Sequence, residues 1–204
     1  ENPPLPLMRN ETVIEAPAVQ ETLTQRYTNE TVKFIHANKD KPFFIYLSHT
    51  MPHVPWHASS DFKGKSSNGI YGDVIEEIDY STGKILEALK ESGVDDNTLI
   101  VFTSDNGGIR RNNIPLSGGK ATIMEGGMRV PCVMRWPSRI PAGTSCDEVC
   151  TTMDLLPTFA RLAGTKEPDD RIIDGKNILN LMQHKSCARS PHEAFYYYFM
   201  SQLR

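Results

Sequence analysis

The stretch Thr98-Leu-Ile-Val-Phe-Thr-Ser-Asp-Asn-Gly-Gly108 joins an apolar run directly to a polar turn that contains two glycines. Residues 98–103 have the length and the uninterrupted hydrophobicity that are typical of a strand buried on both faces. A second run of this kind is Phe43-Phe-Ile-Tyr-Leu-Ser48, and residues 131–136 predict a third strand. The loops that follow residues 48 and 103 are therefore the predicted functional loops, because α/β sheets bind ligands beyond the carboxyl ends of their strands.

Helical periodicity separates the predicted strands. A helix over residues 22–38, begun by a capping Thr22, is indicated by Leu23, Tyr27, Phe34 and Ile35. A longer amphipathic helix ends near Gly93 and is traced by Tyr71, Val74, Ile75, Ile78, Ile85, Leu86 and Leu89. Residues 154–162 predict a short helix, and the proline-rich residues 1–18 predict an extended surface segment. Together these elements predict an α/β fold with a mainly parallel sheet flanked by helices.

Composition excludes several classes of protein. The 204 residues are 39% hydrophobic and carry a formal net charge of -3, which disfavours a nucleic-acid partner. No apolar run reaches the roughly 20 residues that cross a membrane, so no membrane partner is expected. Because the chain begins at Glu1 and stops at Arg204, we expect a fragment or a processed piece. Oligomeric state is not predictable, and neither is the pairing of Cys132, Cys146, Cys150 and Cys187.

The loop after the first predicted strand, Ser48-His-Thr-Met-Pro-His-Val-Pro-Trp-His57, holds three histidines. An imidazole can ligate a metal, move a proton or donate a hydrogen bond to an anion. Pro52 and Pro55 flank His53 and restrict its backbone, which suits a preorganised donor. A loop with incidental histidines would show the same spacing.

The loop after residue 103 offers Asp105 and Asn106, whose side-chain oxygens are ligands suited to calcium or magnesium. Asp-Asn-Gly is also good turn chemistry, so a simple turn remains open. Shortly afterwards, Gly118-Gly-Lys-Ala-Thr-Ile-Met-Glu-Gly-Gly127 places Lys120 on a loop. Its ammonium could neutralise an anionic substrate oxygen, although an exposed surface lysine is equally consistent.

Several motifs resemble the sulfatase family, particularly arylsulfatase A and N-acetylgalactosamine-6-sulfatase. They lie in residues 42–46, 71–79, 102–107, 119–129 and 153–157, which read PFFIY, YGDVIEEID, FTSDNG, GKATIMEGGMR and MDLLP. The resemblance implies the alkaline phosphatase-like sulfatase fold, incomplete here. It also implies that residues 1–165 are the C-terminal part of the catalytic domain and that residues 166–204 begin a smaller, truncated subdomain.

Carried over residue by residue, the resemblance implies that Asp105 and Asn106 are two ligands of one calcium ion, and that Lys120 contacts the substrate sulfate. His53 matches the histidine that binds the sulfate and protonates the leaving oxygen. His49 and His57 are expected to be neighbours of the site. Glu125 and Arg129 are expected to hold the loop rather than to touch the substrate.

The family's nucleophile is a formylglycine made from Cys or Ser in a Cys-x-Pro-Ser-Arg motif, and this motif is absent from the 204 residues. Cys187-Ala-Arg-Ser-Pro191 has a similar composition in the wrong order. The other calcium aspartates are missing as well, so the chain alone is expected to be inactive. Gly118 stands where lysosomal relatives have a disulfide-bonded cysteine, so the expected location is secreted, periplasmic or lysosomal.

The predicted function is therefore that of a sulfuric ester hydrolase fragment, an arylsulfatase-like enzyme by family, whose parent acts on a sulfated small molecule or glycan. A metal-dependent phosphodiesterase or phosphomutase of the alkaline phosphatase superfamily is the alternative, although such enzymes usually supply more metal ligands. A noncatalytic truncated product is a third possibility. The particular sulfate ester cannot be read from the sequence.

Overall fold

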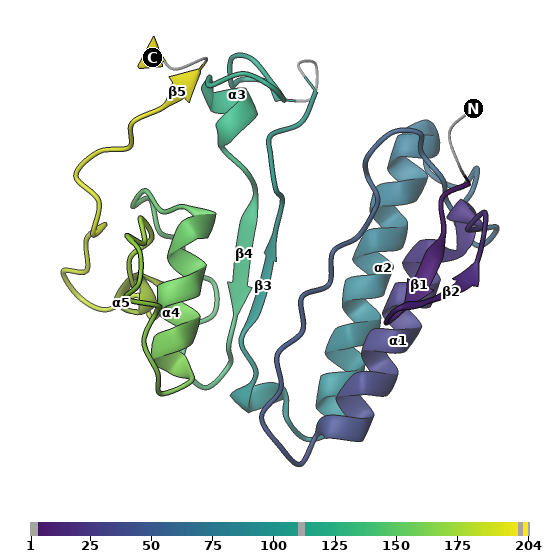
Figure 1. The fold of residues 1–204 in the computed structure, drawn as a ribbon, viewed down its shortest axis with the longest axis horizontal. Helices are drawn as coiled ribbons and strands as arrows, with labels where there is room; N and C mark the ends of the chain where they lie inside the picture. Colours follow the sequence, from purple (N-terminus) through teal and green to yellow (C-terminus); the bar gives the residue numbers. More distant parts are fainter. Residues whose placement is uncertain (1–3, 110–112, 200–201, 204) are drawn as a thin grey trace. The chain divides into compact units, whose positions relative to one another are not determined.

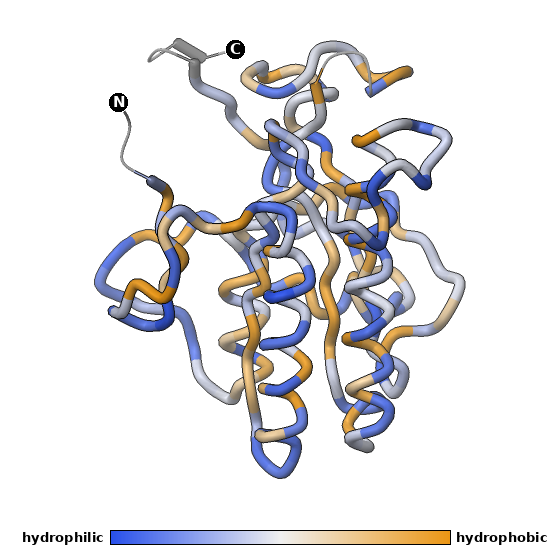
Figure 2. The backbone as a smooth tube through the Cα atoms, turned by 90° about the vertical axis from the view of Figure 1, so that its right-hand side faces the viewer, coloured by the Kyte–Doolittle hydropathy of each residue, from blue (hydrophilic) through white to orange (hydrophobic). Residues whose placement is uncertain are grey.

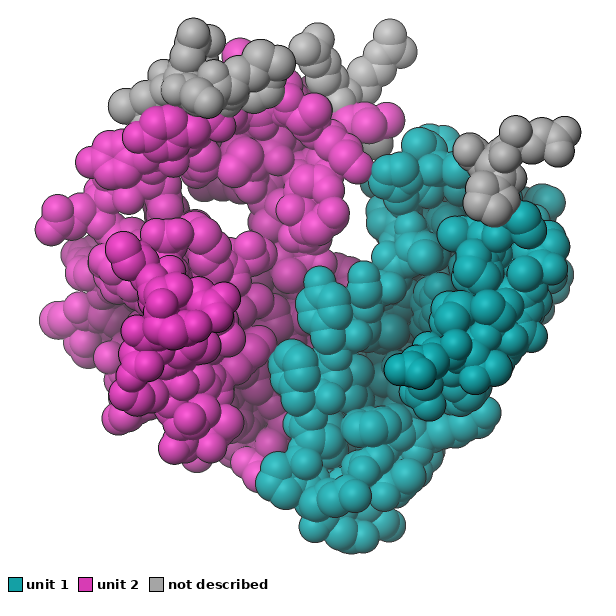
Figure 3. Space-filling view, viewed as in Figure 1, with its two compact units in different colours: residues 1–95 teal, residues 96–204 magenta. Residues whose placement is uncertain are grey.

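The computed structural model describes residues 4–109, 113–199 and 202–203. The chain divides into two compact units, Glu1–Asp95 and Asp96–Arg204, which Figure 3 colours separately. The predicted boundary after residue 165 is a different kind of division and stays a prediction. Within the described residues, no helix is long and apolar enough to cross a membrane.

The first unit is built on two long helices, α1 (Leu23–Asn38) and α2 (Gly69–Glu91), which pack side by side and run in the same direction (Figure 1). The Thr28 and Ser81 hydroxyls share a buried hydrogen bond of 2.6 Å, and His36 Nδ1 meets Ser92 Oγ at 3.0 Å. Both predicted helices are thus confirmed. Hydrophobic and hydrophilic residues are interleaved along them, as amphipathic helices require (Figure 2).

The buried face of α1 differs from the predicted one. Leu23 and Ile35 are buried, but Phe34 is 43% exposed and Tyr27 is half-buried. Their places on the buried face are taken by Thr24, Thr28 and Thr31. Small hydroxyl side chains suffice here because Thr28 and Thr31 donate to backbone carbonyls within the helix, at 2.7 and 2.8 Å. The predicted capping role of Thr22 is wrong, since its hydroxyl donates to the Val19 carbonyl instead.

Of two predictions about extended segments in the first unit, one needs correction. A short antiparallel hairpin of β1 (Leu7–Arg9) and β2 (Thr12–Glu15) lies within the predicted surface segment. Residues 43–48, predicted as a buried strand, are assigned to no strand. Only alternate side chains there are covered, and Phe44 and Tyr46 are 69% and 83% exposed. Hydrophobicity alone therefore gave the wrong burial for this run.

In the second unit, β3 (Ile100–Thr103) pairs with β4 (Cys132–Arg135). Both strands lie within predicted strand ranges, so these two predictions are confirmed. The pairing is antiparallel, and so is every ladder among the described residues, including that of β5 (Tyr198–Phe199) and β6 (Gln202–Leu203). The predicted parallel direction is thus not observed here. The reason is that the described residues between β3 and β4 form loops and one short helix, α3 (Glu125–Met128), and include no crossover helix of the kind that parallel neighbours need.

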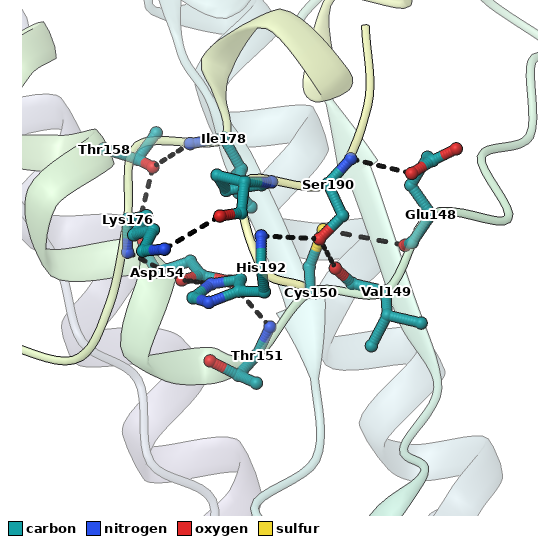
Figure 4. A network of polar contacts seen from close by, with 11 residues as sticks. Glu148, Val149, Cys150, Thr151, Asp154, Thr158, Lys176, Ile178, Ser190 and His192 are labelled. Atoms are coloured by element: carbon teal, nitrogen blue, oxygen red, sulfur yellow. Dashed lines mark hydrogen bonds and ion pairs between the residues drawn. The ribbon is translucent and has the colours of Figure 1, made fainter. Parts of the chain in front are cut away.

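The predicted helix near residue 154 is confirmed as α4 (Leu155–Leu162), and it is followed by a short α5 (Leu179–Met182). Asp154, fully buried before α4, accepts hydrogen bonds from Thr151 N–H and Lys176 N–H, both at 2.8 Å, and from His192 Nε2 at 2.6 Å (Figure 4). One carboxylate thereby ties residues from three parts of the unit together. Ile178, Leu181 and Met182 complete a hydrophobic cluster beside it.

Candidate active site

The loop after β3 is bonded to the loop that carries Lys120. Lys120 N–H donates to the Gly108 carbonyl at 2.8 Å, and Gly107 N–H donates to the Gly127 carbonyl at 2.9 Å. The Asn113 side-chain amide also donates to the carbonyl of Gly108, at 2.8 Å, and to that of Gly118, at 3.2 Å. The structure therefore brings the segment of Asp105 and Asn106 together with the segment of Lys120, beyond the carboxyl end of β3.

Glycines make this close approach of the two loops possible. A Cβ added to Gly107 would overlap the carbonyl oxygen of Gly126, and one added to Gly127 would overlap the carbonyl oxygens of Thr122 and Gly119. Both glycines are buried. The glycines that the sequence suggested as turn formers are thus needed mainly because backbone lies against backbone.

The three polar side chains at this end of β3 differ in exposure. Asp105 and Lys120 are exposed and Asn106 is half-buried. Within the described residues, neither the Asp105 carboxylate nor the Lys120 ammonium has a side-chain hydrogen-bond or ion-pair partner. Their chemistry fits an oxygen-liganded divalent cation and an anion. Two ligands fall short of the six to eight that calcium takes, and no group of three or more acidic, histidine or cysteine side chains in the described ranges could hold a metal.

His53 belongs to the first unit and follows the buried Met51 by two residues. The imidazole is exposed, and its Nδ1 lies 2.7 Å from the carbonyl oxygen of Val54. Because a carbonyl only accepts, Nδ1 carries the hydrogen, and a neutral ring then has an unprotonated Nε2. The ring can donate from Nε2 to an anion only when it is protonated.

The neighbouring histidines have other surroundings. His57 Nδ1 lies 3.3 Å from a carboxylate oxygen of Glu21. His49 is half-buried, its Nδ1 has no partner among the described residues, and burial holds its pKa below the usual value of 6.5. Glu125, the first residue of α3, and Arg129, which follows its last residue, pair with each other at 3.5 Å on the surface. The predicted roles of these four residues stay predictions.

Two of the four cysteines are poorly suited to act as nucleophiles. All four are free thiols. Burial, followed by the charge of Asp154, raises the pKa of Cys150 to about 11, and burial also raises the pKa of Cys132. Both thiols are therefore protonated near neutral pH, a state in which cysteine is a poor nucleophile.

Sequence reasoning missed two buried carboxylates on α2, Asp73 and Glu77, which are each 1% exposed. They lie on one face of the helix, one turn apart, within a stretch that was noted only for its family resemblance. The available signal was their position on the same face as Val74 and Ile78, where an ionised side chain is rarely buried without partners.

An α/β protein with glycine-supported polar loops at a strand end is a class that commonly binds anionic esters. Comparison with known proteins narrows this class. The Sulfatase family model matches residues 2–165. The chain is 43% identical to human steryl-sulfatase over 208 residues and 42% identical to mouse N-acetylgalactosamine-6-sulfatase over 184 residues. These alignments cover 97% and 86% of this chain, but 36% and 35% of the relatives.

A solved structure agrees with this assignment. The crystal structure of Ps i-CgsB in complex with k-i-k-neocarrahexaose superimposes with a TM-score of 0.74 at 37% identity, covering 85% of this chain and 40% of that one. The chain belongs to the sulfatase family and has part of its alkaline phosphatase-like α/β fold. It spans about a third of the length of the curated relatives that it matches.

Proposed function

We propose that this chain supplies part of the active site of a sulfuric ester hydrolase. The observation that supports the proposal is the bonded pair of loops beyond β3, one of which carries Asp105 and Asn106 while the other carries Lys120. A carboxylate–amide pair suits one divalent cation, and a nearby ammonium suits the sulfate anion. Sulfatase family membership supports the same assignment.

Each residue has a distinct proposed role. Asp105 and Asn106 would hold a calcium ion, which when bound would neutralise charge on the sulfate oxygens. Lys120 binds a sulfate oxygen through its ammonium group. His53 in its protonated form donates from Nε2 to the sulfate and gives that proton to the leaving oxygen, since its Nδ1–H is already engaged with Val54.

The nucleophile, the family's formylglycine, and the remaining calcium ligands are proposed to come from protein outside these 204 residues. By itself the chain is therefore expected to hydrolyse no aryl sulfate. The proposed substrates are sulfated small molecules or glycans, and the oligosaccharide bound by Ps i-CgsB gives one example of the larger kind. A secreted, periplasmic or lysosomal location of the full-length protein is part of the proposal.

The test compares the rates at which the full-length protein hydrolyses three esters of 4-nitrophenol. We expect calcium-dependent hydrolysis of 4-nitrophenyl sulfate and much slower hydrolysis of the 4-nitrophenyl phosphate monoester and diester. Asp105→Ala should raise the calcium concentration needed for half-maximal activity. A preference for the phosphate diester would instead support the phosphodiesterase alternative, which no observation favours at present. Absence of activity toward all three esters would contradict the proposed sulfuric ester hydrolase activity.

A further inference from the structure

Two buried carboxylates of α2 hold the backbone of residues 59–66. The Glu77 carboxylate accepts a hydrogen bond from Ser59 N–H at 3.0 Å. The Asp73 carboxylate accepts three, from Gly64 N–H at 2.7 Å, Lys65 N–H at 3.1 Å and Ser66 N–H at 2.7 Å. Four backbone donors of one loop thus end on two side chains of one helix face.

The helix surface around these carboxylates is shaped for this loop. Gly72 is buried beside Asp73, and a Cβ added there would overlap the Ser66 side chain. The three backbone donors compensate for burying the Asp73 charge, and they hold its pKa below the usual value, with the Gly64 bond the largest cause. These contacts are therefore specific attachment points and not incidental surface bonds.

The same loop continues backward into the segment that carries His53. Ser59 follows His53 by six positions, and between them Ala58 is buried in a cluster with Met51. Trp56 Nε1 donates to the Pro52 carbonyl at 2.9 Å, and its ring packs on Tyr71 of α2 with centroids 5.3 Å apart. His53 thus lies in a short segment whose ends, Pro52 and Trp56, are joined by a hydrogen bond. The chain that follows this segment is bonded to α2 at Ser59.

We propose that Asp73 and Glu77 are positioning residues for His53, fixing the position and orientation of its imidazole. This inference rests on the proposed function, because it uses the sulfate-binding role of His53. Neither carboxylate touches the substrate. They act on the position of His53 through the backbone of residues 59–66 and the segment that the Trp56–Pro52 hydrogen bond closes.

The two carboxylates should respond differently to conversion into amides. Asp73 uses both oxygens as acceptors, so in Asp73→Asn the new NH2 group must face a backbone N–H. Glu77 uses Oε2 only, and its Oε1 has no partner among the described residues. Glu77→Gln can therefore keep the bond to Ser59 through its remaining oxygen, whereas Glu77→Ala cannot.

The first test measures amide hydrogen exchange along the 204-residue chain. Asp73→Asn should speed exchange at residues 64–66 by about tenfold, the loss expected when a buried donor is left unpaired. Glu77→Ala should do the same at Ser59, and Glu77→Gln should restore protection. Glu76→Gln and Asp79→Asn, exposed positions on the same helix, are the matched controls. Unchanged exchange, or an equal rise throughout α1 and α2, would overturn the anchoring role.

The second test is a double-mutant cycle in the full-length enzyme. Asp73→Asn should lower kcat for an aryl sulfate, and adding it to His53→Ala should cost nothing further, because the residue acts through the histidine. Additive losses would refute positioning. If His53→Ala alone leaves turnover unchanged, the proposed role of His53 is wrong. The proposal that Asp73 and Glu77 position His53 for catalysis is then wrong as well. The exchange data, which need no activity, still report separately whether the loop is anchored.

Discussion

The candidate loops of this chain are held in two different ways. The loop of His53 is fixed by side chains of a long helix, chiefly the buried carboxylates Asp73 and Glu77. The loop of Asp105 and the loop of Lys120 are fixed to each other by backbone bonds between glycine-rich segments. The loop of His53 should therefore be disturbed by loss of a carboxylate on α2. The glycine-rich loops should instead be disturbed by a methyl group added to a glycine.

The largest expected effect separates chemistry from folding. Lys120→Ala in the full-length enzyme should lower kcat for 4-nitrophenyl sulfate by about 100-fold or more, since removing one preorganised donor to a reacting anion commonly costs that much. Its side chain is exposed, so the urea midpoint should not move. An unchanged kcat would remove Lys120 from the site.

A smaller effect tests the backbone contact of the second loop. Gly107→Ala forces a Cβ onto the Gly126 carbonyl oxygen and should cost about 1–3 kcal/mol of unfolding free energy, measured by urea titration. Gly83→Ala in α2 is the control, because a Cβ there meets no atom. It should be neutral or stabilising by about 0.5–1 kcal/mol. Equal effects of the two changes would contradict the glycine explanation.

The smallest effect concerns acid sensitivity in the first unit. The folded pKa of His49 lies below its unfolded value near 6.5, so below that pH the unfolded chain binds the proton more readily. Stability is therefore lost as pH falls from about 6.5 toward the lower folded pKa. His49→Gln should shrink the drop in urea midpoint between pH 7.5 and pH 5.5. An identical drop in both proteins would show that His49 makes no contribution.

Local pattern was enough to predict most elements but not their burial. The helices α1, α2 and α4 and the strands β3 and β4 follow from periodicity and apolar runs. The strand predicted over residues 43–48 failed because an apolar run does not reveal whether a partner strand lies beside it. The prediction of the inward face of α1 failed for a related reason, since Thr28 is buried where it bonds to Ser81 on another helix.

By itself, the sequence determined the α/β class, the family and the polar residues at the end of β3, because these depend on short-range periodicity and contiguous motifs. Only the tertiary structure decided the antiparallel pairing of β3 with β4, the joining of the two glycine-rich loops, and the use of Asp73 and Glu77 as anchors. The physical reason is that each of these depends on hydrogen bonds between residues distant along the chain, whose partners no local pattern specifies.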